Sequence, residues 1–235
     1  MKGVCPEFWS GGEARADDRR RSYTSLTGAN WALGRFLLPQ LGSWAKREEG
    51  LVLDFGCGDS PFRREFHRAR GYVRADIAPK GPGSIVVDGV RIPIRDESID
   101  CVLVAQVLGD VPDLVALLRE FQRVLRPGGC VVIFETMAYP EHDLPHDYFR
   151  VLPHGVEWAG ELVGLREAEI VRLGGFFTRV AGLLNPFVMG VLRAHWATRP
   201  LGVAGTVLIN IAAVVLDGIF HHPSLAPDYL ARMRK

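Results

Sequence analysis

The stretch LVLDFGCGDSPF (51–62) decides the fold. A short apolar run ends in Asp54 and passes directly into a turn that contains Gly56, Cys57 and Gly58. Glycines at such a point let the backbone come close to a ligand, and ligands of open α/β sheets bind at the carboxyl ends of the strands. The stretch therefore predicts a buried strand followed by a ligand-binding turn. A tight strand-to-helix turn without a ligand is the alternative.

Apolar runs and helical segments alternate on the C-terminal side of this turn. Strands are predicted at 51–55, 72–77, 84–88, 99–107, 130–136 and 168–173, and helices at 62–69, 114–125 and 155–164. Strands rich in Val and Ile that alternate with helices are typical of a parallel sheet covered on both faces. Right-handed crossovers then favour an α/β fold with a doubly wound, mostly parallel sheet.

The flanking segments complete one predicted domain. Residues 1–21 are rich in Gly, Arg and Asp, and the apolar spacing over 28–46 predicts a helix broken at Pro39. We expect an N-terminal tail and helical cover over 1–50, a core over 51–176, an apolar helical insertion or cap over 177–227, and a C-terminal antiparallel edge strand over 228–235.

The amino-acid composition indicates which cellular compartment and which classes of binding partner to expect. The 235 residues are 48% hydrophobic and 23% charged, with a net charge of +1. Such a balance provides no field that attracts nucleic acid, so no nucleic-acid partner is predicted. The four cysteines include no CxxC pair, so no metal site is expected and a reducing cytoplasm is favoured. The N-terminus has no apolar segment of the kind found in signal peptides.

The stretch PLGVAGTVLINIAAVVLDGIF (200–220) approaches the length of a membrane span. Asn210, Asp217 and several glycines interrupt it, and a buried or dimer-interface helix is apolar all round in the same way. We favour an inserted helical layer that makes an oligomer contact, such as a homodimer, or a peripheral contact with a membrane surface. The predicted location is the cytoplasm, with membrane association through 200–220 left open.

Two further acidic positions accompany the glycine turn. Asp76 ends the second predicted strand, 22 positions after Asp54, where a carboxylate can take both hydroxyls of a ribose. Asp88 and Gly89 follow the third strand, where a carboxylate and an open backbone amide can pair with an adenine edge. A strand-end Asp that only starts a turn is the alternative for Asp76.

Of two common nucleotide-binding motifs, the dinucleotide fingerprint is weakened and the P-loop is excluded. A dinucleotide fingerprint needs a third glycine where this chain has Pro61, and no GxxxxGK[ST] sequence occurs.

The chain resembles class I S-adenosylmethionine (SAM)-dependent methyltransferases of the broad methyltransferase type 11 group. The resemblance lies in four elements that occur in this order: LDFGCG, Asp76, VVDGVRIPIRDESIDCVLVAQVL and LLREFQRVLRPGG. The resemblance covers 51–136 and continues more weakly to Gly175. It implies a Rossmann-like fold, SAM as cofactor with S-adenosylhomocysteine as product, and no metal.

Carried over by position, the resemblance implies the cofactor contacts. The turn with Gly56, Cys57 and Gly58 would lie against the methionine part of SAM, and Asp54 would hold that turn. Asp76 would bind the ribose, and Ile77 would pack on the adenine. Asp88 and Gly89 would contact the adenine edge, and Gln106 would line the sulfonium end.

The acceptor side departs from the family. Relatives often carry Glu-His after the fourth strand where this chain has Gly109 and Asp110, so a general base cannot be carried over. Candidate catalytic residues are His146, His142 and Asp110, because an acceptor hydroxyl or protonated amine must lose a proton and His titrates near neutral pH. Each of them can also be a helix cap or a loop contact.

The sequence favours methyl transfer to a small-molecule acceptor in biosynthesis, such as a natural product, a sugar or a lipid-linked intermediate. The alternatives are a nucleic-acid methyltransferase, a non-catalytic binding or assembly subunit of the same fold, and an enzyme that binds SAM without transferring its methyl group. Failure to bind SAM would favour the non-catalytic subunit.

Overall fold

The computed structural model describes residues 16–78, 84–142, 144–192, 195–220 and 222–235, so most of the predicted tail lies outside the described residues. The described strands are β1 (Leu51–Phe55), β2 (Gly71–Asp76), β3 (Ser84–Val86), β4 (Ile99–Ala105), β5 (Leu125–Thr136), β6 (Arg166–Leu173) and β7 (Asp228–Arg234). The α-helices are α1 (Ala16–Thr24), α2 (Trp31–Ala45), α3 (Leu114–Val124), α4 (Pro153–Leu162), α5 (Phe176–Leu192) and α6 (Arg199–Ile219). Short 3₁₀ turns are η1 (Arg63–Phe66), η2 (Leu108–Asp110) and η3 (Pro223–Leu225).

The described chain divides into two compact units. One contains Leu37–Leu173 and Pro227–Lys235, which form the sheet unit, and the other contains Met1–Phe36 and Gly174–Ala226, which form the helical unit.

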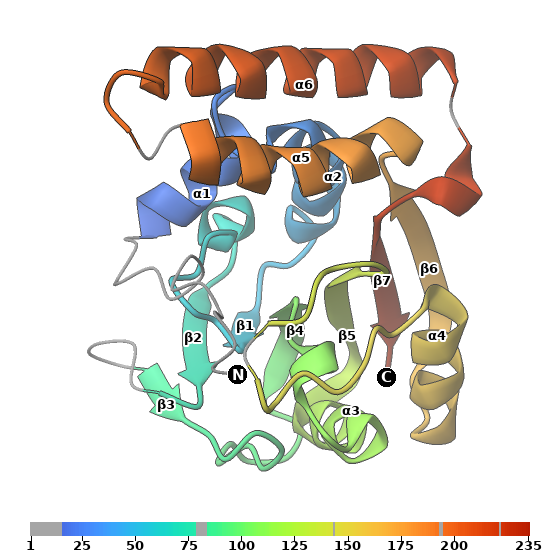
Figure 1. The fold of residues 1–235 in the computed structure, drawn as a ribbon. Coiled ribbons are helices and arrows are strands. Elements are labelled where there is room, and N and C mark those ends of the chain that lie inside the picture. The colour runs from blue at the N-terminus through green and yellow to red at the C-terminus, as the bar shows by residue number, and fades with distance from the viewer. Residues whose placement is uncertain (1–15, 79–83, 143, 193–194, 221) are drawn as a thin grey trace. The chain divides into compact units, whose positions relative to one another are not determined.

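The sheet unit has the strand order β3-β2-β1-β4-β5-β7-β6. The first five of these strands are mutually parallel, and β7 is antiparallel to both of its neighbours. Figure 1 shows β7 between β5 and β6. The mostly parallel Rossmann-like sheet with an antiparallel C-terminal strand is therefore confirmed, with one correction. The edge is formed by β6 and not by 228–235, because β6 pairs with the outer side of β7.

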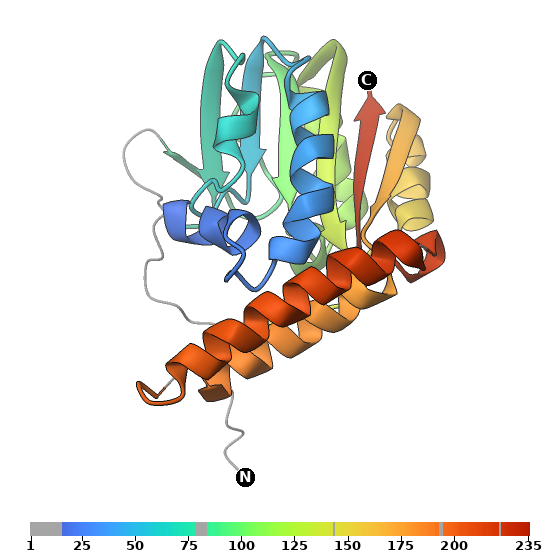
Figure 2. The same ribbon diagram turned by 90° about the horizontal axis from the view of Figure 1, so that it is seen from above.

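Helices cover both faces of the sheet (Figure 2). On one face α3 buries Leu117, Leu118, Phe121 and Val124, and the ring of Phe121 meets Phe55 edge-on at 5.1 Å between centroids. Asp113 caps α3 by accepting a hydrogen bond of 2.8 Å from the amide of Ala116. The buried side chains of α2 include Leu37, Leu41 and Trp44.

Four element predictions were wrong in detail. The helix over 28–46 is not broken, since Pro39 lies inside a continuous α2; burial of the residues around it outweighs the lost hydrogen bond. The helix over 62–69 is only the 3₁₀ turn η1. The predicted third strand stops at Val86, and the fifth begins at Leu125.

Candidate active site

The predicted cofactor residues follow neighbouring parallel strands. β1 pairs with β2 on one side and with β4 on the other, and Phe55 lies opposite both Ala75 and Val104. The order of the strands along the chain reverses at β1. Open α/β sheets bind ligands at the carboxyl side of such a switch point.

The turn after β1 depends on its glycines. Gly56 has φ of +65° and Gly58 of +47°, which a side chain would strain. A Cβ atom at Gly56 would lie 2.3 Å from Cγ2 of Val107. The amide of Cys57 donates a 3.0 Å hydrogen bond to the carbonyl of Ala75, which fixes the turn against β2. Burial raises the pKa of the Cys57 thiol to about 12, so this thiol stays protonated.

Asp76 ties the end of β2 to the same turn. Its Oδ2 accepts a hydrogen bond of 2.9 Å from the amide of Gly58, and its Oδ1 accepts one of 3.2 Å from the amide of Ala78. Both carboxylate oxygens of Asp76 take part in holding the loop. Asp76 therefore shapes the loop, and its contact with a ribose stays a prediction.

Asp54 lies deeper than the sequence suggested. Its Oδ2 accepts a 2.8 Å hydrogen bond from the hydroxyl of Tyr72. Burial raises the pKa of the Asp54 carboxyl to about 6, against the opposing effect of hydrogen bonds. This buried carboxyl therefore helps to hold the turn in place. A contact between Asp54 and the amino group of SAM stays a prediction.

The positions predicted to meet adenine differ in exposure. The side chain of Ile77 is 72% exposed directly after β2, which suits an apolar ring that lies against it. Oδ1 of Asp88 accepts the amides of Val90 at 3.2 Å and Arg91 at 2.7 Å. These amides hold the pKa of Asp88 below its usual range. Gly89, at φ of +94°, has open space where a Cβ would stand.

Gln106 is exposed at the end of β4 with φ of +56°, an unusual conformation for a residue with a side chain. Its amide donates a 2.7 Å hydrogen bond to the carbonyl of Phe134. Backbone outliers of this kind gather at functional sites, so Gln106 remains a candidate for the reacting end of the cofactor.

Glu135 supports the loop that follows Gln106. Oε1 of this buried carboxyl accepts the amides of Val107 and Leu108, both at 2.8 Å. Burial raises the pKa of Glu135 to about 7, and the charge of Asp110 acts in the same direction. The sequence analysis missed Glu135 because it stands in an apolar strand with no motif around it.

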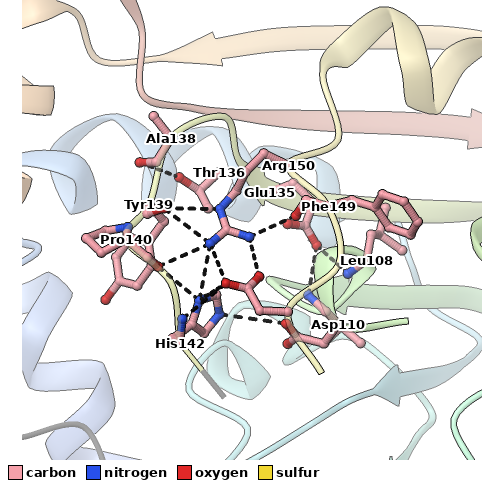
Figure 3. Close-up of polar contacts among 12 residues, drawn as sticks. Leu108, Asp110, Glu135, Thr136, Ala138, Tyr139, Pro140, His142, Phe149 and Arg150 are labelled. Carbon is pink, nitrogen blue, oxygen red and sulfur yellow. Dashed lines mark hydrogen bonds and ion pairs between the residues drawn. The ribbon is translucent and has the colours of Figure 1, made fainter. Parts of the chain in front are cut away.

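On the predicted acceptor side, Arg150 is the centre of a polar cluster (Figure 3). Its guanidinium donates to both carboxylate oxygens of Asp147, and the Nη2–Oδ2 bond is 2.8 Å. It also donates to the carbonyls of Tyr139, Pro140 and Phe149. The pKa of Asp147 is therefore held well below its usual range, chiefly by the hydrogen bonds from Arg150. Arg150 fixes the loop between β5 and α4.

Two of the predicted catalytic residues join this cluster. Nε2 of His142 lies 3.7 Å from Oδ1 of Asp110, and its Nδ1 lies 3.2 Å from the carbonyl of Pro140 and 3.5 Å from Oδ2 of Asp147. Figure 3 shows the imidazole between Arg150 and Asp110. His142 and Asp110, which are 32 positions apart, are thus neighbours.

His146 is not part of this arrangement. It is exposed, and its Nδ1 lies 3.2 Å from the hydroxyl of Tyr148. Arg150 was missed by the sequence analysis, although Asp147 and Arg150 stand three positions apart as an ion pair would.

Two groups of side chains among the described residues bear on the expected absence of a metal: the buried Glu48, Cys101 and Cys130, and a second group on the acceptor side. Asp110, His142 and Asp147 offer ligand atoms within 4.8 Å of one another, a spacing that an ion can bridge. Arg150 already supplies the positive charge beside Asp147, so an ion pair accounts for the arrangement.

Comparisons with known proteins agree with this geometry. Residues 53–133 match the family described as a methyltransferase domain. The chain is 25% identical over 189 residues to the ubiquinone/menaquinone biosynthesis C-methyltransferase UbiE of Desulfotalea psychrophila, which covers 64% of this chain and 74% of that protein.

Solved structures share the fold. The [4+2]-cyclase SpnF has a TM-score of 0.56 and 18% identity, covering 85% of this chain and 79% of its own. The phosphoethanolamine N-methyltransferase 2 of Haemonchus contortus in complex with SAM has a TM-score of 0.53 and 15% identity, covering 96% of this chain and 60% of its own.

The glycine turn at the switch point, the carboxylate of Asp76 and the exposed Ile77 also fit the adenosyl group that such proteins bind. The match of residues 53–133 to a methyltransferase domain, and a fold shared with a solved N-methyltransferase, agree with the class I SAM-dependent methyltransferase group that the sequence resembles.

Proposed function

We propose that the chain transfers the methyl group of SAM to a small-molecule acceptor, such as a natural product, a sugar or a lipid-linked intermediate. The observation that carries this proposal is the turn Gly56–Gly58 tied to Asp76 at the point where the strand order reverses. The similarity to a C-methyltransferase of quinone biosynthesis supports an acceptor of low molecular weight.

On the cofactor side, SAM when bound would supply a methyl carbon that its sulfonium activates for in-line attack by the acceptor, with S-adenosylhomocysteine as the leaving group. The task of the protein is to align the two reactants and exclude water. The backbone of Gly56 and Gly58 would approach the methionine part, Asp76 would hold the ribose, and Ile77 would pack on the adenine. Asp88 and Gly89 would contact the adenine edge, and Gln106 would line the end where transfer occurs.

On the acceptor side, the proposal assigns proton transfer to His142 with Asp110. The carbonyl of Pro140 beside Nδ1 favours a tautomer with its proton on Nδ1, which leaves Nε2 as the basic atom. Asp110 then stabilises the imidazolium that forms when Nε2 takes a proton from a hydroxyl or ammonium group. Arg150 and Asp147 act as positioning residues because they hold the loop that carries His142.

The alternative is a protein of this fold that binds SAM without methylating, or that acts as a binding or assembly subunit. The Gly109–Asp110 departure from the family favours it. That SpnF, a [4+2]-cyclase, shares the fold shows that the architecture also serves other reactions.

Calorimetric titration with SAM, S-adenosylhomocysteine and NAD tests the cofactor assignment. Binding of both adenosyl compounds without binding of NAD supports it, and a folded sample that binds neither favours the assembly subunit. Transfer of labelled methyl from SAM to a panel of phenols, amines, sugars and quinols then separates methylation from silent binding.

The matched pair His142→Ala and His146→Ala tests the acceptor side. We expect His142→Ala to lower kcat by about 10²-fold or more with SAM affinity unchanged, the usual size of general-base catalysis. His146→Ala, outside the cluster, should leave kcat unchanged. Equal effects of the two variants would remove His142 from the proposed role.

A further inference from the structure

The longest helix of the helical unit, α6, has an inverted distribution of polarity. One face is buried, and its residues are small or polar: Gly202, Thr206, Asn210, Ala213 and Asp217. Every residue between Pro200 and Phe220 that is not buried is apolar or a glycine. A soluble surface helix normally has the opposite arrangement.

The buried polar side chains have specific partners within the same unit. Asp217 accepts the amides of Gly175, Phe177 and Thr178 and the hydroxyl of Thr178, so α6 caps the start of α5. Nδ2 of Asn210 donates to the carbonyls of Leu26 at 2.8 Å and Gly28 at 2.9 Å. Asn210 and Asp217, the two polar residues that interrupt the apolar stretch 200–220, are therefore both buried against the same unit.

α5 extends the apolar surface. It runs antiparallel beside α6 (Figures 1 and 2), and Leu183, Leu184, Phe187 and Val191 are exposed on it. The only charged side chain of α5, Arg179, donates to the carbonyl of Ala226 at 3.0 Å. We call the exposed apolar side chains of α5 and α6 the hairpin face. Contiguous exposed apolar patches on a protein commonly mark interaction surfaces.

The surroundings of α6 argue against a span across a membrane. By length and composition α6 could cross one, with 21 residues, or about 32 Å of helix, and a mean hydropathy of 1.9. However, residues 26–28 are bonded to Asn210, and Ala213 packs with Ala32 and Ala181. The chain's own N-terminal segment thus occupies one side of the helix. Only the hairpin face is open.

Charge and composition distinguish a lipid surface from a protein partner. Protein interfaces have a polar rim and about one hydrogen bond per 100–200 Å², whereas α6 exposes no polar side chain between Pro200 and Phe220. At the connection between the helices, Trp196 is 83% exposed and Arg199 follows it. Over 174–226 three arginines and one aspartate give a formal charge of +2. Trp and Arg beside an apolar face are typical of helices that lie in a bilayer interface.

We propose that the hairpin face docks into the surface of a bilayer that contains anionic lipid, with α5 and α6 lying in the plane of the membrane. The inference rests on the helical unit alone and does not depend on methyl transfer. It gives the enzyme access to acceptors that partition into membranes.

Flotation of the full chain with vesicles tests the proposal. Phosphatidylcholine vesicles with and without phosphatidylglycerol are the probes, and Leu208→Gln/Val215→Gln is the variant, because these side chains are 68% and 53% exposed on the hairpin face. The matched control is Leu152→Gln/Leu162→Gln, whose side chains are 56% and 55% exposed in the sheet unit. Circular dichroism checks that each variant is folded.

We expect the wild type and the control to float with the vesicles, more strongly with phosphatidylglycerol. The hairpin variant should lose at least about tenfold in partitioning, since each side chain no longer leaves water for lipid. Failure of the wild type to float, or equal flotation of both variants, would overturn the proposal. Sedimentation velocity run in parallel identifies the other occupant: a dimer that the hairpin variant converts to monomer would assign the face to a second copy of this chain.

Discussion

Asp76 is the residue on which the cofactor assignment depends most. Its carboxylate accepts hydrogen bonds from the amides of Gly58 and Ala78, and it ends β2 beside the glycine turn, where a ribose is predicted to bind. Asp76→Asn keeps one oxygen as acceptor but removes the charge. We expect affinity for S-adenosylhomocysteine to fall by about 1.5–3 kcal/mol, the size of a charge-assisted hydrogen bond.

Calorimetry measures this change, with the exposed Glu161→Gln as control. Unchanged affinity of a folded Asp76→Asn protein would show that the carboxylate serves the loop alone.

Glu135 makes stability depend on pH. Its pKa rises from 4.5 in the unfolded chain to about 7 in the folded one, chiefly through burial. The folded state then binds more protons than the unfolded state between these values. The free energy of unfolding therefore falls as pH rises from about 4.5 to 7, by about 3 kcal/mol at most. Asp54 contributes with the same sign up to about pH 6.

Glu135→Gln isolates this effect because a carbonyl oxygen can still accept the amides of Val107 and Leu108. Urea unfolding of both proteins at pH 5 and pH 8 checks it. The loss of stability at pH 8 should be smaller in the variant. Parallel losses in the two proteins would mean that Glu135 does not titrate in this range.

At the scale of elements, the cap on α5 is supplied by another helix. Asp217→Ala leaves the amides of Gly175, Phe177 and Thr178 without their acceptor. We expect a loss of about 2–4 kcal/mol in the free energy of unfolding, more than a usual N-cap because the site is buried.

Chemical denaturation followed by circular dichroism measures the loss, and Ser224→Ala, which removes an exposed hydrogen bond to His222, is the control. A change of less than about 0.5 kcal/mol in Asp217→Ala would be typical of a surface position and would contradict the cap.

Elements with strong local signals could be predicted from the sequence. The strands β1, β2 and β4 and the helix α3 are close to their predicted ranges because each is an apolar run bounded by Gly, Asp or a charged turn. η1 was overestimated as a helix, and Pro39 was given too much weight as a breaker. In both cases packing against other elements decided the outcome, and local propensity does not contain that information.

At the scale of the whole molecule, a net charge of +1 bears on the partners. The hypothesis of a nucleic-acid methyltransferase requires a basic surface that neutralises phosphates. We expect no change in the fluorescence anisotropy of labelled RNA or double-stranded DNA up to about 100 μM protein at physiological salt, the weak end of the ~10⁻⁴–10⁻⁶ M range of non-specific binding. Salt-sensitive binding within or below that range would reopen the hypothesis.

The sequence by itself predicted the sheet and the glycine turn of this protein. The glycine turn after β1, Asp76 after β2 and the alternation that predicts a doubly wound sheet are signals within a few residues of chain, because a parallel sheet brings its strand ends together by construction.

The tertiary structure alone decided the rest. It brought His142 beside Asp110 and left His146 outside, since loop geometry selects between two histidines that are four positions apart. It placed β7 between β5 and β6, so that β6 forms the edge of the sheet. It also buried the side chains of Asn210 and Asp217 of α6. The two carbonyls to which Asn210 donates are more than 180 positions away in the chain. Which face of an apolar helix is buried is set by such distant contacts, and the periodicity of the helix does not contain them.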